Sequence, residues 1–130
     1  MILENLKKFS KKVALVTKDS KLIKYKDLIQ YIENFKFHIK GNKKLTFLFC
    51  SNDVEIIIAY LSFLDLRNPL MLIDSTLDDK KINELINSYN PEYIFINKNH
   101  LNKKKYFQLF YFAKRNNQFH RMMVLLKNLK

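Results

Sequence analysis

Apolar positions along the chain follow two rhythms, one typical of strands and one typical of helices. Short apolar runs predict strands at residues 13–17, 22–25, 45–50, 69–73 and 93–96. Apolar residues spaced three and four positions apart predict helices over residues 2–10, 26–40 and 53–66, with a fourth ending at Tyr89. Strands that alternate with helices indicate a parallel sheet with right-handed crossovers.

The first two strands predict a hairpin. Residues 13–17 form a compact apolar run, which is a signal for a buried strand, and residues 18–21 are typical of a tight turn. In the next helix one face carries apolar residues at Leu28, Ile29, Ile32, Phe35 and Ile39. Gly41, just beyond that helix, favours a left-handed cap.

The middle of the chain predicts the most buried elements. Residues 45–50 are apolar throughout, as in a strand covered on both faces. Asn52 stands three residues before Glu55, which predicts a helix N-cap with a returning acidic partner. Apolar side chains nearly encircle the helix over residues 53–66, so we expect it to be buried rather than docked by one face.

The second half of the sheet is punctuated by polar residues and proline. Pro69 is tolerated at the start of a strand. Thr76 and Asp79 are expected to cap the next helix, and Asn90 with Pro91 to end it.

These elements predict an α/β fold over residues 1–96, a mostly parallel, Rossmann-like sheet with flanking helices. Residues 97–130 differ, because basic and aromatic residues cluster there without clean periodicity. We therefore treat them as a separate basic aromatic tail, in which one or two helices are one alternative. No internal repeat is visible at the periods typical of solenoids.

Composition excludes several kinds of site. Hydrophobic residues make up 48% of the 130 positions, enough for a core. One glycine in the whole chain excludes a glycine-built phosphate loop, and the single Cys50 excludes a disulfide framework and a cysteine-based zinc site. The sequence therefore carries no self-sufficient catalytic set.

The formal charge is +12, and residues 93–130 hold nine basic and no acidic side chains. Such a tail attracts phosphates or anionic lipid headgroups. The competing interpretation is a coding bias that favours Lys, Asn, Ile, Phe and Tyr throughout. With no signal peptide and no apolar run long enough for a membrane span, we expect a cytoplasmic protein.

Three aspartates, Asp74, Asp78 and Asp79, form an acidic cluster of the kind that holds magnesium. We favour a structural interpretation, in which Asp74 ends a strand and the other two complement a helix N-terminus. Cys50 precedes a helix N-terminus that would activate a thiol. Since no histidine lies nearby in sequence, we favour a small buried hydrophobe.

Other polar positions have plainer explanations. Tyr25 is expected to pack at the start of a helix, and Asn52 to cap one. The three histidines share no metal-ligand spacing: His38, His100 and His120. Residues 103–107 resemble a stacking surface for nucleic acid, but a solvated face over packed aromatic rings explains them better. No residue is therefore assigned as catalytic, cofactor-binding or metal-binding.

The ordered series of segments resembles the N-terminal region of the adenylate-forming (AMP-binding) superfamily, which includes acyl-CoA synthetases, peptide-synthetase adenylation domains and luciferases. The similarity rests on segments that match family features in order. Residues 13–16 match the opening strand, 22–28 the leucine-threonine-tyrosine turn into the first helix, and 45–52 the apolar strand ending in asparagine. The elements that follow match residues 57–66, 72–74 and 85–95. Three positions depart from the family: Arg67 replaces a glycine, Leu72 a proline and Lys24 a threonine.

Several of the family's functional motifs have no counterpart in this sequence: the ATP-phosphate loop, the acidic magnesium motif, the ribose-binding aspartate and the catalytic lysine. The resemblance therefore implies a truncated or frame-shifted fragment, the scaffold part of an AMP-dependent ligase, inactive alone. The parent enzyme would use ATP and magnesium, whereas this chain would hold no cofactor.

The resemblance also implies partners. We expect the missing remainder of the ligase, or a second copy of the chain, to cover an exposed apolar face. The alternative is a small basic α/β domain that binds nucleic acid or another anionic partner.

Overall fold

The computed structural model describes residues 2–37, 39, 43 and 45–96. Gly41 and the tail at 97–130 lie outside them, so the predicted cap and the tail stay predictions. The elements follow the predicted order: α1 (Ile2–Lys7), β1 (Val13–Val16), β2 (Leu22–Lys24), α2 (Tyr25–Phe37), β3 (Thr46–Cys50), α3 (Val54–Asp65), β4 (Leu70–Asp74), α4 (Asp79–Tyr89) and β5 (Tyr93–Phe95).

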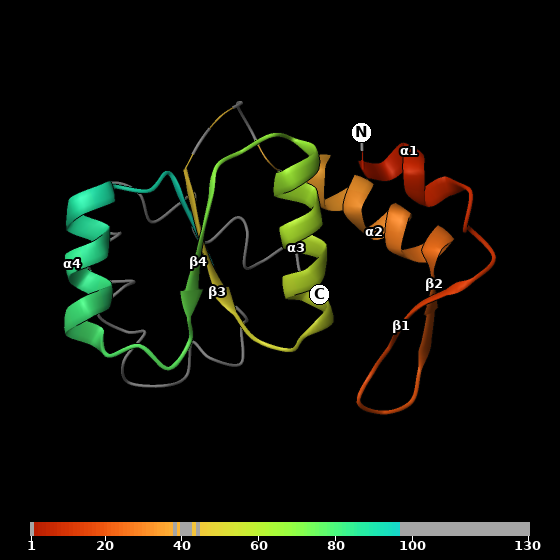
Figure 1. The fold of residues 1–130 in the computed structure, drawn as a ribbon, viewed down its shortest axis with the longest axis horizontal. Helices are drawn as coiled ribbons and strands as arrows, with labels where there is room; N and C mark the ends of the chain where they lie inside the picture. The colour runs from red at the N-terminus through yellow and green to blue at the C-terminus, as the bar shows by residue number, and fades with distance from the viewer. Residues whose placement is uncertain (1, 38, 40–42, 44, 97–130) are drawn as a thin grey trace.

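The main sheet has the strand order β4-β3-β5, and both pairings are parallel. Leu48 in the central strand is level with Leu72 on one side and Phe95 on the other. Helix α4 covers one face of the sheet and α3 covers the other, with α2 and α1 beyond α3 (Figure 1). The predicted α/β fold with parallel strands is confirmed.

Two cores lie on the two faces of the sheet, because successive residues of a strand point to opposite sides. Leu48 and Phe95 pack toward α3, in one cluster with Phe63. Phe47 and Phe49 pack toward α4, in a second cluster with residues such as Ile82 and Ile86. The three apolar residues Phe47, Leu48 and Phe49 of β3 are therefore at most 1% exposed, and the prediction of a strand covered on both faces is confirmed.

An aromatic contact fastens α2 to the rest of the fold. The centre of the Phe35 ring lies 5.6 Å from that of Phe63 in α3 and 5.5 Å from that of Phe95 in β5, and both pairs are edge-to-face. Edge-to-face pairs add about 1 kcal/mol each beyond the area that they bury. One side chain of α2 thus links a helix and a strand that lie far away in the sequence.

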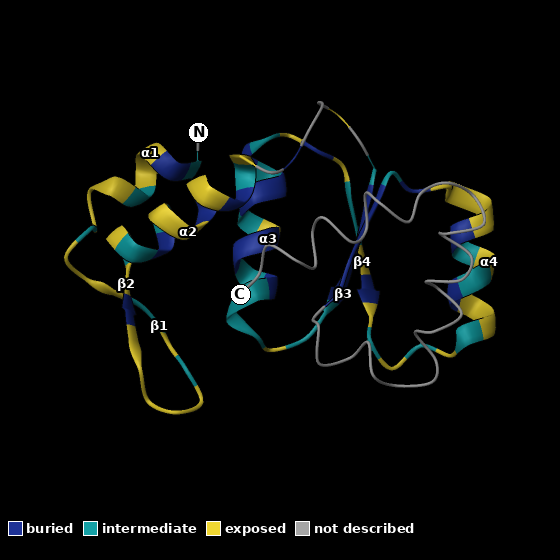
Figure 2. Cartoon of the chain, turned by 180° about the vertical axis from the view of Figure 1, so that it is seen from behind, coloured by how far each residue is buried: buried dark blue, intermediate teal, exposed yellow. Residues whose placement is uncertain are grey.

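The hairpin β1–β2 forms a separate two-stranded sheet, closed by the predicted turn after Thr17. Leu15 and Ile23 face the core, but Val16 is 65% exposed. The prediction of a buried first strand is therefore wrong. A two-stranded sheet has only one face against the body of the protein, so alternate apolar residues remain in solvent (Figure 2).

Two predicted caps fall on the wrong residue. Asn52 is exposed, and the N-cap of α3 is its neighbour Asp53. Asp78, not Thr76 or Asp79, caps α4 by accepting a hydrogen bond from a backbone amide of the first turn at 2.9 Å. Neighbouring Asp, Asn, Ser and Thr compete for such positions, because any of their oxygens satisfies the same amides.

Helix ends differ slightly from the sequence pattern. Tyr25 already belongs to α2, and that helix ends at Phe37, so the buried Ile39 lies beyond it. Helix α4 ends at Asn90 as predicted, with that residue in the left-handed conformation. Its exposed Tyr89 does not join the buried face.

The turn from α3 to β4 uses a left-handed residue. Arg67 has φ 58°, and its amide donates to the carbonyl of Leu64 at 2.9 Å, while the Asn68 amide donates to Phe63, also at 2.9 Å. This pattern closes a helix with a Schellman motif, whose left-handed position favours glycine. The family resemblance implies glycine at this position, and the turn forms with arginine in its place.

A buried ion pair joins α2 to α3. The Lys36 ammonium lies 2.6 Å from a carboxylate oxygen of Asp65, whose side chain is 1% exposed. Burial acts to raise the pKa of Asp65. The hydrogen bond and charge of Lys36, with the backbone amides of Leu3 and Ile2, outweigh it and hold that pKa below its ordinary value. Asp65 therefore stays ionised and ties α2 to α3.

We predict that Arg67→Gly raises the free energy of unfolding by about 1 kcal/mol, because glycine carries no steric penalty in the left-handed region. Arg67→Ala is the control, since alanine keeps the Cβ that causes the penalty. Urea unfolding measures both variants. Equal stability of the glycine and alanine variants would contradict the assigned backbone conformation.

We predict that Lys36→Met lowers the free energy of unfolding by about 3 kcal/mol at pH 7, because it leaves a buried carboxylate without its cation. The loss should shrink as the pH falls, since protonation of Asp65 removes the charge that needs a partner. Lys7→Met is the matched control, because its ion pair with Glu4 is exposed and contributes at most about 1 kcal/mol. Equal losses in the two variants at pH 7 would refute the role of the buried pair.

Candidate functional site

The carboxyl end of a parallel sheet is where α/β proteins usually bind ligands. Here β3 ends at Cys50 and β4 at Asp74, which face each other in register. One oxygen of Asp74 accepts hydrogen bonds from the Thr76 amide at 2.8 Å and from its hydroxyl at 2.7 Å. Asp74 is thus used to shape the loop that follows β4.

The three predicted aspartates divide between a strand end and a helix start. Asp74 ends β4, Asp78 is the N-cap of α4, and Asp79 lies in the first turn of that helix. Among the described residues no three His, Cys, Asp or Glu side chains come together as a metal site. The structure thus places all three as the structural interpretation expects.

Cys50 is half-buried, and its thiol donates to the carbonyl of Leu48 at 3.6 Å. Burial raises the pKa of this thiol above its ordinary value, and the charge of Asp74 raises it further. The nucleophilic form of cysteine is the thiolate, so at neutral pH this residue is a poor nucleophile.

Tyr25 is another candidate from the sequence that the structure describes. Tyr25 packs against Phe9, with ring centroids 5.9 Å apart, which confirms its predicted packing role at the start of a helix. The other candidates lie outside the described residues: His38, His100, His120 and residues 103–107.

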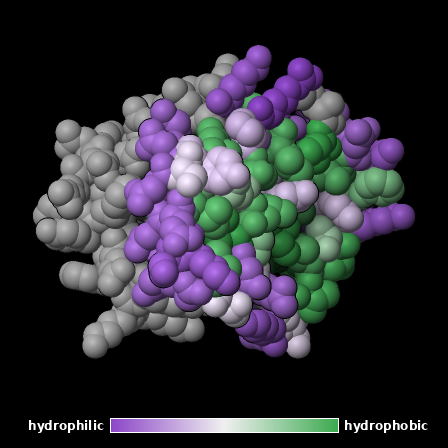
Figure 3. Space-filling view, turned by 60° about the vertical axis from the view of Figure 1, so that its left-hand side comes forward, coloured by the Kyte–Doolittle hydropathy of each residue, from purple (hydrophilic) through white to green (hydrophobic). Residues whose placement is uncertain are grey.

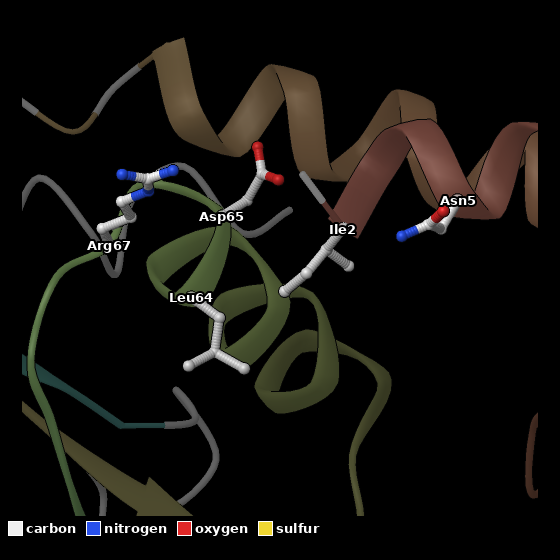
Figure 4. A pocket seen from close by; sticks show the side chains of 5 residues that line it. All are labelled: Ile2, Asn5, Leu64, Asp65 and Arg67. Atoms are coloured by element: carbon white, nitrogen blue, oxygen red, sulfur yellow. The ribbon is translucent and has the colours of Figure 1, made fainter.

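A hollow of about 290 Å³ lies where α1 meets the end of α3, lined by Ile2, Asn5, Leu64, Asp65 and Arg67 (Figure 4). The Asp65 carboxylate points from α3 toward α2, where Lys36 binds it. The carboxylate of the hollow is thus already bound through one oxygen to Lys36.

The outer side of α3 carries a row of apolar side chains that are not fully buried. Ile57, Tyr60, Leu61 and Leu64 follow one another at helical spacing on the side opposite the buried residues, and none of them is fully buried. We call these four residues, with Leu72 of β4, the α3–β4 flank. Tyr60 is 37% and Leu72 55% exposed. The space-filling view shows a broad hydrophobic area on one face of the molecule (Figure 3).

The flank corrects the prediction that α3 is buried all round. The sheet covers one side of α3 and α2 covers another. On the third side Tyr60 is 37% exposed, and Ile57, Leu61 and Leu64 are only partly buried. The sequence contained the signal, because residues 57, 60, 61 and 64 form a second apolar stripe beside the buried one. The pattern alone did not show which stripe would be covered.

Solved structures share this fold. The luciferase-like enzyme of the nonluminescent mealworm Zophobas morio superposes with a TM-score of 0.69 at 17% identity, over 87% of this chain and 27% of the enzyme. The N-terminal subdomain of Klebsiella oxytoca NpsA, in complex with anthranilyl-AMSN, gives 0.61 at 16%, over 72% and 25%. Apo MatB from Rhodopseudomonas palustris gives 0.65 at 10%, over 96% and 24%.

These likenesses, at 10–17% identity, show the fold that this chain shares with part of each neighbour. This chain spans about a quarter of the length of those neighbours. No family model and no curated protein matches it. Within the described residues, no helix is both long and apolar enough to cross a membrane.

We predict that Cys50 reacts with iodoacetamide more slowly at pH 8 than an unstructured cysteine peptide, because its raised pKa leaves less thiolate. Asp74→Asn should speed the reaction and shift its pH midpoint downward, since the nearby negative charge is removed. The single cysteine makes mass spectrometry a direct readout. Reaction as fast as the peptide would contradict a protonated, half-buried thiol.

Proposed function

We propose that residues 13–96 act as the scaffold of an adenylate-forming ligase and contribute no ATP or acyl site of their own. The α3–β4 flank is then the surface against which the remaining polypeptide of the ligase packs. The activity would belong to the assembled protein, with ATP and magnesium bound by that polypeptide.

The flank is the observation that carries this proposal. Its side chains are apolar at Ile57, Leu61 and Leu64, and no charged residue interrupts them along that side of α3. Monomeric proteins rarely leave a contiguous apolar surface uncovered unless it binds something. The matched region makes up only about a quarter of each neighbour of the same fold, which supports a large covering polypeptide.

The polar groups of the fold support the second half of the proposal. The loops after β3 and β4 carry no glycine, so backbone amides have no ready cradle for a triphosphate. Asp74 already accepts hydrogen bonds from the loop after β4, and Asp78 accepts one from the first turn of α4. Cys50 is protonated and Asp65 is paired, so neither is poised for proton transfer.

Co-expression with the polypeptide encoded next to this chain, followed by ATP–pyrophosphate exchange, tests the proposal. We expect co-purification and exchange in the presence of a carboxylic acid substrate. Tyr60→Lys with Leu72→Lys should abolish both, because lysine would have to be buried at the interface. Leu22→Lys is the matched control, since that leucine is 58% exposed but lies on the hairpin.

Two results would overturn the proposal. One is exchange by this chain alone, and the other is co-purification that the flank variants leave unchanged.

We further predict that the purified chain shows no magnesium-dependent heat of ATP binding in a calorimeter up to millimolar ATP. A Kd in the micromolar range would mean that the fold holds a nucleotide site without a glycine loop. Circular dichroism of the same sample verifies that the chain is folded during the titration.

A further inference from the structure

Basic charge is concentrated at one end of the described fold. Residues 1–26 hold eight lysines and two acidic residues, whereas residues 27–92 hold seven basic and ten acidic residues. The first segment contains α1 and the hairpin β1–β2, which together form one end of the molecule (Figure 1). The positive charge of the described residues is therefore polarised toward the hairpin.

The same hairpin exposes aliphatic side chains. Val16 and Leu22 are register partners, so they lie on the same face of the hairpin, opposite to Leu15 and Ile23. Val16 is 65% and Leu22 58% exposed, and Val13, a register partner of Lys24, is 44% exposed. We call Val13, Val16 and Leu22 the hairpin face.

Exposed lysines flank the hairpin face along the chain. Lys18 and Lys21 flank the turn and Lys24 ends β2, and all three are exposed. On the adjoining segment, the ammonium groups of Lys8 and Lys12 lie 5.2 and 5.5 Å from the ring centre of the exposed Phe9. Apolar side chains flanked by lysines are the composition of surfaces that bind the interface of a membrane.

The tip of the hairpin is held in shape. The Thr17 amide donates to the Lys21 carbonyl at 2.9 Å, and the Lys21 amide donates to the Thr17 hydroxyl oxygen at 3.0 Å. The Thr17 hydroxyl in turn donates to Asp19, the one acidic residue of the hairpin. Binding through Val16 and Leu22 therefore costs no further conformational entropy for ordering the turn.

We propose that the hairpin face binds the surface of an anionic phospholipid membrane. Val16 and Leu22 enter the boundary between headgroups and acyl chains, while Lys18, Lys21 and Lys24 remain among the lipid phosphates. A nucleic acid is disfavoured, because its phosphates would leave the aliphatic side chains in contact with charge and water. This inference does not rest on the proposed ligase function.

A tryptophan reporter tests insertion directly, because the chain contains no tryptophan. The full chain with Leu22→Trp is mixed with vesicles of phosphatidylcholine alone or with a quarter of phosphatidylserine. We expect a blue shift and quenching by brominated acyl chains with the anionic vesicles. Tyr89→Trp is the control, since that exposed residue lies on α4 at the other end of the fold and should show neither.

Vesicle sedimentation tests the lysines. Each lysine near an anionic surface contributes about a five-fold gain in partitioning, so Lys18→Gln with Lys21→Gln should weaken it about 30-fold. Lys80→Gln with Lys81→Gln removes the same charge from α4 and should change it less than about three-fold. Comparing the two double variants distinguishes binding by the hairpin lysines from attraction by the net charge of the whole protein, including its basic tail.

Three results would overturn the proposal: equal losses from the two lysine pairs, no quenching of the Leu22→Trp reporter, or displacement from the vesicles by RNA at equal phosphate concentration. The last result would assign the surface to nucleic acid instead.

Discussion

Helix α3 sets the main constraint on this fold, because it is apolar on nearly every side and has to be covered from several directions. The sheet covers one side, where Ala59 and Phe63 are fully buried. Helix α2 covers a second side, fastened by Phe35 and by the Lys36–Asp65 pair. The third side is the α3–β4 flank. Because this apolar surface is exposed, we expect a further partner to cover it.

The buried ion pair shows how the fold tolerates charge inside this arrangement. Asp65 ends the most apolar helix, and an isolated carboxylate there would be costly. Lys36 reaches it from α2, and the backbone amides at the start of α1 act on the same carboxyl group. The ion pair therefore helps to fix α2 against α3, whose relative position hydrophobic contacts alone specify less strictly.

The sequence predicted the order and type of the elements because the two periodicities are local. The sequence did not predict features that depend on competition between neighbouring residues or on contacts between residues far apart in the chain. Asn52 and Asp53 are both good N-caps, and local preference does not choose between them. Lys36 and Asp65 are 29 positions apart, so no pattern links them. The first strand looks buried by composition, but exposure depends on whether another sheet covers its outer face.

The uneven distribution of charge is visible in the sequence, but the net charge of residues 1–92 conceals it. Residues 1–92 together carry a small positive excess, which conceals a basic N-terminal segment followed by an acidic one. Only the structure shows that the basic segment is one spatial unit with exposed Val16 and Leu22. The flank and the hairpin face are therefore distinct surfaces. The first contains no charged residue, and the second is flanked by lysines.

The oligomeric state of the isolated chain tests the central role of the flank most directly. Multi-angle light scattering across a hundred-fold range of concentration should show reversible association, because two uncovered flanks bury each other when no other partner is present. Tyr60→Lys with Leu72→Lys should return the chain to a monomer with unchanged circular dichroism. A native chain that stays monomeric at the highest concentration would contradict the account.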